Sequence, residues 1–140
     1  MIIAVDFDGT IVTHEYPAIG KLIPFSIDTL KRIQDEFHHQ LILWTVREGE
    51  ELSAAVEFCR ARGLEFYAIN TNYPEKMEND IQPRKLMADL FIDDRNLGGI
   101  PDWGVIYQMI KTDNCFVPVS NEIQREYTLP KKSFLKSIFG

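Results

Sequence analysis

The sequence lacks the features of membrane, secreted and disulfide-rich proteins. No apolar run approaches the roughly 20 residues that a membrane span needs. The first residues carry no basic leader of the kind found in secretory signals, and they run straight into an acidic motif. There are only 2 cysteines in 140 residues, which fits reduced intracellular thiols. We therefore expect a cytoplasmic protein that does not bind membranes.

The chain also lacks a basic character and a histidine-rich metal motif. Its formal net charge of -6 argues against general affinity for nucleic acid, so we expect no stable nucleic-acid binding. His14, His38 and His39 have no metal-ligand spacing to a cysteine or to another histidine, and we interpret them as flap and surface residues. The sequence does not decide whether the chain forms homo-oligomers.

Composition favours one modest globular domain. With 45% hydrophobic and 26% charged residues, the chain can bury a real core. No internal repeat or low-complexity tract interrupts it. We expect a catalytic domain over residues 1–120. Residues 121–140 form a C-terminal extension that we expect to pack on the same domain, because its apolar residues have helical spacing.

Predicted strands and helices alternate along the chain. Apolar runs predict strands at residues 1–5, 41–45, 65–69 and 88–94, with an edge strand at 115–119. Helical spacing predicts helices that begin behind Ser26 as an N-cap, that end at Gly63, and that open at Pro101. This alternation predicts a three-layer α/β fold with a mostly parallel sheet, in which ligands bind at the carboxyl ends of the strands.

The most informative motif is Asp-Phe-Asp-Gly-Thr at residues 6–10, directly after the first predicted strand. It places the carboxylates of Asp6 and Asp8 at the end of a buried strand. Burying ionised carboxylates is unfavourable unless a cation, a lysine or a shared proton compensates them. The motif therefore indicates a metal-assisted catalytic site.

Three further motifs lie close to the ends of predicted strands, and they occur in a fixed order along the chain. Thr45 ends the second apolar run, Lys85 precedes a later run, and Asp93 and Asp94 end that run. This order resembles the haloacid dehalogenase-like superfamily of phosphohydrolases, and the resemblance covers residues 2–99. It implies a Rossmann-like parallel sheet of strand order 3-2-1-4-5, with the Asp6 strand in the centre.

The resemblance is to members of that superfamily without a cap domain. Residues 11–21 are long enough for a short flap but too short for a cap, and residues 70–83 are also too short for the larger caps. An open site of this kind would admit bulky or macromolecular substrates. The partner that we expect is a phosphorylated small molecule or an exposed phosphate on a larger molecule.

The resemblance assigns a role to each motif. Asp6 is the expected nucleophile, which forms an aspartyl-phosphate, and Asp8 is the expected general acid and base. Mg²⁺ suits such an all-oxygen site and offsets the repulsion between carboxylate and phosphate. The metal ligands are then Asp6, Asp8 through its backbone carbonyl, Asp93 and Asp94. Thr45 and Lys85 complete the catalytic set by binding phosphoryl oxygens.

Substrate contacts and the function itself remain open in part. We expect substrate contacts from Phe7, Gly9, Thr10 and Arg47. Arg47 is equally well explained as an arginine paired with a nearby acid. The leading function is a magnesium-dependent phosphatase. The alternatives are a polynucleotide-end phosphatase, a receiver-like phosphorylatable domain and a non-catalytic module.

Overall fold

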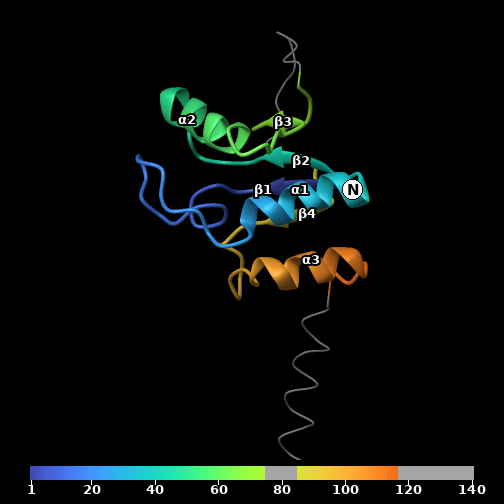
Figure 1. The fold of residues 1–140 in the computed structure, drawn as a ribbon. Helices are drawn as coiled ribbons and strands as arrows, with labels where there is room; N and C mark the ends of the chain where they lie inside the picture. The colour runs from blue at the N-terminus through green and yellow to red at the C-terminus, as the bar shows by residue number, and fades with distance from the viewer. Residues whose placement is uncertain (75–84, 117–140) are drawn as a thin grey trace, which may run out of the picture.

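A computed structural model of the chain describes residues 1–74 and 85–116. Its centre is a four-stranded sheet in which every pair of neighbouring strands is parallel (Figure 1). The strands are β1 (Ile2–Val5), β2 (Gln40–Leu43), β3 (Ala68–Ile69) and β4 (Leu90–Ile92). Their order is β3-β2-β1-β4, so the strand that precedes the acidic motif lies inside the sheet.

The described sheet differs from the predicted order 3-2-1-4-5 by the fifth strand. Cys115 and Phe116 form no strand, and the rest of the predicted strand at 115–119 lies outside the described residues. The third strand is also shorter than predicted. Ile42 pairs with Ala68, so Glu65 would lie opposite His39, before β2 begins.

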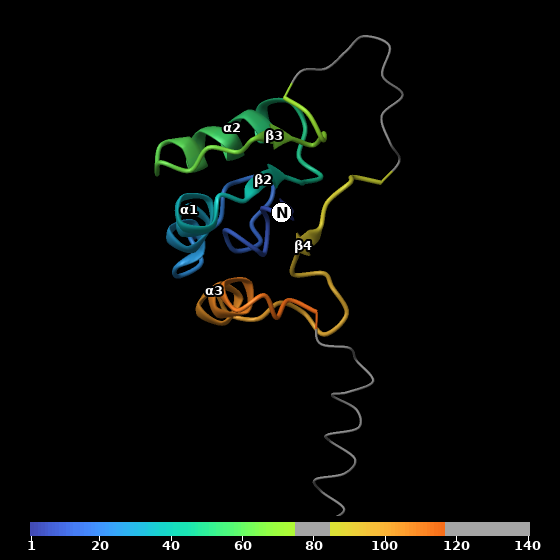
Figure 2. The same ribbon diagram turned by 90° about the vertical axis from the view of Figure 1, so that its right-hand side faces the viewer.

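Three helices cover one face of the sheet (Figure 2). They are α1 (Ser26–Phe37), α2 (Gly49–Arg60) and α3 (Trp103–Lys111). Alternate residues of the strands, such as Ile3 and Val5, pack against these helices in the main core. The intervening residues, such as Ala4 and Ile42, face a smaller cluster with Leu86 on the other side. The described residues therefore form two layers instead of the predicted three, since no helix among them covers that second face.

The helix ends correct two sequence predictions. Ser26 is the first residue of α1 rather than its N-cap, and its hydroxyl donates a 3.0 Å hydrogen bond to the backbone oxygen of Ile11. Pro101 does not open α3, because Asp102 caps that helix by accepting a bond from the Val105 amide. Gly63, which is predicted to end the second helix, lies in the turn after it, because α2 ends at Arg60 with Ala61 as its C-cap. Gly63 has a φ of +80°, and its amide donates to the Arg60 oxygen.

Residues 11–23 form the expected flap beside the acidic motif. The Thr13 amide donates to the Lys21 oxygen at 2.8 Å, and the Ile23 amide donates to the Ile11 oxygen at 2.9 Å. These bonds close the segment into a small hairpin that leads into α1. None of the helices described has both the length and the apolar character needed to cross a bilayer.

Candidate active site

Three carboxylates converge at the carboxyl edge of the sheet. Val5 of β1 pairs with Ile92 of β4, so Asp6 and Asp93 leave their strands side by side. Carboxylate oxygens of Asp6, Asp93 and Asp94 lie within 4.8 Å of one another. All three side chains are partly buried. The parallel pairing of β1 and β4 thus brings together acids that are more than 80 positions apart in the sequence.

The Thr10 hydroxyl connects the two strand ends. Its oxygen lies 3.3 Å from Asp6 Oδ2 and 3.5 Å from Asp94 Oδ1, and it accepts a 3.1 Å bond from the Asp94 amide. His14, from the flap, lies with Nε2 2.8 Å from Asp94 Oδ2. A β-carbon at Gly9 would collide with both His14 and Asp94, which explains why glycine with a φ of +83° occupies that position.

The acids perturb one another's protonation. Burial raises the pKa of Asp6 from 3.8 to about 7, a rise that the Phe7 backbone N–H partly offsets and that the charges of Asp93 and Asp94 increase. Burial alone would raise the pKa of Asp94 as well, but hydrogen bonds with His14 and Asp6 outweigh it and lower that pKa. The pKa values of these two neighbouring carboxyl groups shift in opposite directions. This indicates that the site holds a proton unless a cation takes its place.

The cluster fits a divalent cation such as Mg²⁺. Its donors are all carboxylate oxygens, which hard cations prefer, and they converge closely enough to share one ion. One oxygen of Asp94 is engaged by His14, and Asp93 Oδ1 accepts a 2.8 Å bond from the Arg95 amide. Asp6, Asp93 and Asp94 are therefore the residues that would hold the ion.

Asp8 is held in a different environment from Asp6. Its two carboxylate oxygens accept 2.7 Å hydrogen bonds from Nε and Nη2 of Arg47. The Arg47 side chain is completely buried and that of Asp8 nearly so. The hydrogen bonds to Asp8 raise the pKa of Arg47 above its usual value. Asp8 is thus one half of a bidentate, buried ion pair.

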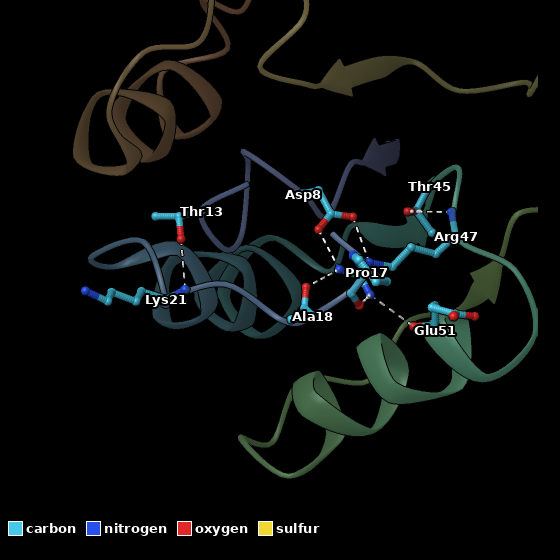
Figure 3. A network of polar contacts seen from close by, with 8 residues as sticks. All are labelled: Asp8, Thr13, Pro17, Ala18, Lys21, Thr45, Arg47 and Glu51. Atoms are coloured by element: carbon cyan, nitrogen blue, oxygen red, sulfur yellow. Dashed lines mark hydrogen bonds and ion pairs between the residues drawn. The ribbon is translucent and has the colours of Figure 1, made fainter. Parts of the chain in front are cut away.

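Arg47 uses every N–H of its guanidinium within the chain, as Figure 3 shows. Beyond the two bonds to Asp8, it donates to the backbone oxygens of Pro17 at 3.0 Å, Ala18 at 2.8 Å and Glu51 at 3.5 Å. Its charge also lies 5.1 Å from the ring centre of Tyr16. In this structure Arg47 joins the motif, the flap and α2, and it presents no donor to a substrate.

Thr45 lies beyond the end of β2, at the same edge of the sheet as the acids. Its amide donates to Asn70 Oδ1 at 2.8 Å, and its hydroxyl oxygen accepts a 3.2 Å bond from the Arg47 amide. Asn70, which follows β3 with a φ of +53°, therefore fixes the turn that carries Thr45. The hydroxyl proton of Thr45 has no acceptor among the residues described.

The structure does not bring every predicted site residue to the acids. Lys85 is exposed and lies with Nζ 5.8 Å from the ring centre of Phe91, and no hydrogen bond or ion pair joins it to the acids in the described part of the chain. The Phe7 side chain is fully buried in the main core. The Gly9 amide already donates to the Val12 oxygen at 2.7 Å.

Three residues of this network have no predicted role in the site. They are His14, which is predicted only as a flap or surface residue, Asn70 and Trp103. The Trp103 indole is buried, but its N–H donates a 3.1 Å bond to the Thr10 oxygen. Their sequence spacing gives no signal for these contacts, since each one joins separate segments of the chain. Only the proximity of His14 to the motif hinted at its position.

Comparisons with known proteins identify a similar solved structure. No family model and no curated protein matches the chain. The solved structure of a conserved protein from Bacteroides thetaiotaomicron has 66% sequence identity and a TM-score of 0.76, with 81% of this chain and 91% of that chain covered. The likeness supports an α/β fold with a parallel sheet, and it leaves the role of the acidic site to be argued from its residues.

The acidic cluster predicts a metal-dependent stability that varies with pH. Because the folded protein binds a proton at Asp6 more tightly than the unfolded chain, metal-free stability is lost as pH rises from about 4 to about 7. Asp6→Asn removes this loss. We expect it to stabilise metal-free protein relative to wild type by about 1–2 kcal/mol more at pH 7.5 than at pH 4.5, less than the full shift implies because the site is partly solvated.

The comparison with Asp6→Asn isolates this aspartate from other groups. Burial lowers the pKa of His39, which gives an opposite pH slope in both proteins and cancels in the difference. Millimolar Mg²⁺ should raise the melting temperature of wild type at pH 7.5 and have little effect on Asp6→Asn. Chemical unfolding and calorimetry measure both effects. A difference in unfolding free energy between the two proteins that does not change with pH would contradict the raised pKa of Asp6.

The Asp8–Arg47 pair predicts strongly non-additive substitutions. Arg47→Met leaves the Asp8 charge buried without its partner and should destabilise the fold by about 3–5 kcal/mol. Combined with Asp8→Asn, it should cost about 1–3 kcal/mol less than the sum of the single changes. Urea unfolding of the four proteins measures this coupling. Additive effects would show that the pair is energetically unimportant.

Proposed function

We propose that this chain, which belongs to the same family as the conserved Bacteroides thetaiotaomicron protein, is a magnesium-dependent phosphatase, because three acids converge in its own site. The proposed reaction hydrolyses a phosphomonoester through an aspartyl-phosphate intermediate. The observation that carries this proposal is the convergence of Asp6, Asp93 and Asp94 within 4.8 Å at the carboxyl ends of β1 and β4.

A cluster of this kind suits phosphoryl transfer better than it suits a structural role. Burial, together with the charges of Asp93 and Asp94, raises the pKa of Asp6, so ionised acids held here without a cation destabilise the fold. A bound divalent cation would neutralise these charges and withdraw charge from the phosphoryl group of a substrate. The Thr10 hydroxyl, bonded to both strand ends, holds Asp6 and Asp94 in register for this purpose.

In the proposed first step, a carboxylate oxygen of Asp6 attacks the phosphorus atom of the ester. An oxygen–phosphorus bond forms to Asp6 while the bond between phosphorus and the leaving oxygen breaks. That leaving oxygen takes a proton and departs as the alcohol. In the second step, water attacks the aspartyl-phosphate, phosphate is released and the Asp6 carboxylate is restored. No oxidant or further co-reactant is required.

Asp8 is the proposed source and acceptor of these protons, and this role requires its pair with Arg47 to open. Both Asp8 oxygens accept hydrogen bonds in the structure, so neither is available to carry a proton to the leaving group. Opening the pair would also free N–H groups of Arg47, and a guanidinium is suited to bidentate contact with a phosphate. We therefore propose that the Asp8 side chain leaves Arg47 when the substrate reacts.

Thr45 is the proposed ligand for a phosphoryl oxygen. Its hydroxyl oxygen is oriented by the Arg47 amide, and its proton remains available to donate. Lys85 would have to move from its position beside Phe91 to serve as a second ligand. The described contacts therefore support Thr45 more directly than Lys85 as a contact for the phosphate.

A non-catalytic metal-binding module is the second candidate. The observation that favours it is the saturated Arg47–Asp8 pair, which withdraws the expected acid and base from use. Such a module would bind Mg²⁺ at Asp6, Asp93 and Asp94 without turning over a substrate. Metal binding alone therefore does not distinguish the two candidates, whereas phosphate release does.

The phosphatase proposal predicts metal-dependent phosphate release. Sugar phosphates, nucleotides and oligonucleotides phosphorylated at either end should be assayed with Mg²⁺ or with a chelator. We expect turnover of at least one substrate with Mg²⁺ and none with the chelator. Asp6→Asn should reduce kcat by at least about 10³-fold, because it removes the nucleophile.

Thr45→Val is the matched variant for the phosphate contact, since it removes the hydroxyl and retains the branched shape. It should lower kcat/KM about 10- to 100-fold while the fold is preserved. Absence of release from every substrate, by folded protein that is stabilised by Mg²⁺, would overturn the phosphatase proposal. That result would favour the non-catalytic module.

A further inference from the structure

A cavity lies beside the acidic motif, since Gly9 and Thr10 are among its lining residues. It has a volume of about 500 Å³, and residues of the motif, of the turn before α1 and of the turn before α3 line it. α1 and α3 begin at the same edge of the sheet, where the acids also lie (Figure 1). A space of this size is suited to a small organic group.

Thr10 joins this cavity to the acidic cluster. Its hydroxyl contacts Asp6 and Asp94, and the residue lines the cavity together with Gly9. The Trp103 indole donates to the Thr10 backbone oxygen at 3.1 Å, which fixes the start of α3 against the motif. A molecule whose phosphate lies at the acids would therefore extend its remaining part along Thr10 into the cavity.

The described residues of the cavity wall are mostly apolar. Ile23, Pro24, Ile100 and Pro101 contribute aliphatic surface, and no lysine, arginine or histidine is among the lining residues within 1–74 and 85–116. The carboxylate of Asp102 is its charged group, and one oxygen of that carboxylate already caps α3 through the Val105 amide. A second phosphate would meet this negative charge without a counter-charge.

Phe25 is the most unusual residue of the wall. Its side chain is 71% exposed, and its backbone has φ 67° and ψ 0°, in the left-handed region that bulky residues rarely adopt. Glycine or asparagine would fit this backbone with less strain, and the Phe25 ring contributes little buried surface to the core. A strained backbone that displays an aromatic ring beside a cavity is a feature of binding sites.

We propose that this cavity binds the leaving group of the phosphomonoester, and that this group is uncharged and carries a flat apolar ring. The inference rests on the proposed phosphatase function and names its substrate class. The ring stacks on Phe25 between the two proline-containing turns, while the phosphate lies at the acids. Sugar phosphates lack an apolar face of this kind, and polyphosphates and oligonucleotides carry charges that the wall does not match.

Kinetics on matched substrates test the proposed class. Benzyl phosphate should have a kcat/KM at least about 10-fold above that of glycerol 1-phosphate, because both release an aliphatic alcohol and only benzyl phosphate supplies a ring. Phe25→Ala should lower kcat/KM for benzyl phosphate about 5- to 10-fold and leave that for glycerol 1-phosphate unchanged. The exposure of Phe25 makes this variant compatible with folding.

Phe116→Ala is the matched control, since Phe116 is also aromatic, is 69% exposed and lies outside the cavity lining. This control variant should leave kcat/KM unchanged for both substrates. Equal rates for the two substrates, or an equal loss for both in Phe25→Ala, would overturn the proposed leaving group while the phosphatase function stands.

Two phosphonates that cannot be hydrolysed test binding in the cavity independently of phosphate release. We expect benzylphosphonate, but not methylphosphonate, to shift the NMR signal of the Trp103 indole N–H. Its Kd should rise about 5-fold or more in Phe25→Ala. This result without any phosphate release would support the ring site and overturn the phosphatase. Equal binding of the two phosphonates would overturn the ring site whether or not the protein releases phosphate.

Discussion

The Arg47 guanidinium is completely buried, and a buried charge without partners would cost several kcal/mol. All its N–H groups are therefore engaged, and the groups that engage it belong to separate parts of the chain: the motif after β1, the flap, and the first turn of α2. Satisfying one arginine thus sets the position of the flap relative to Asp8. The site cannot change there without breaking several bonds at once.

The two aspartates of the motif are compensated in different ways. Asp8 receives a full counter-charge from Arg47, whereas the cluster around Asp6 receives hydrogen bonds from Thr10 and His14 but no arginine or lysine within the described residues. A protein that needed only to bury these carboxylates has the means to pair them, as Asp8 demonstrates. The unpaired cluster is therefore one that the proposed divalent cation could compensate.

The sequence was most informative where strand ends and charged residues coincide. The first strand follows from its apolar run, whereas the placement of Asp6 beside Asp93 and the flap were expected from the family resemblance. The saturation of Arg47 and the role of Asn70 could not be predicted, because each depends on three-dimensional contacts between distant segments. The sequence correctly offered an acid-paired arginine as one alternative, but it indicated neither its burial nor its links to the flap.

The Arg47 network and the cavity lie on different sides of the acidic motif. The Arg47 network lies on the α2 side of β1, and the cavity lies between the starts of α1 and α3 on the side of β4. For the proposed substrate class, a ring bound in the cavity would not displace the residues that anchor the flap, because none of them lines the cavity. The turns before α1 and α3 would then supply apolar contacts to the leaving group. Their positions are set by the hydrogen bonds of Ser26 to Ile11 and of Trp103 to Thr10, so the same motif that holds the acids also places the wall that would select the substrate.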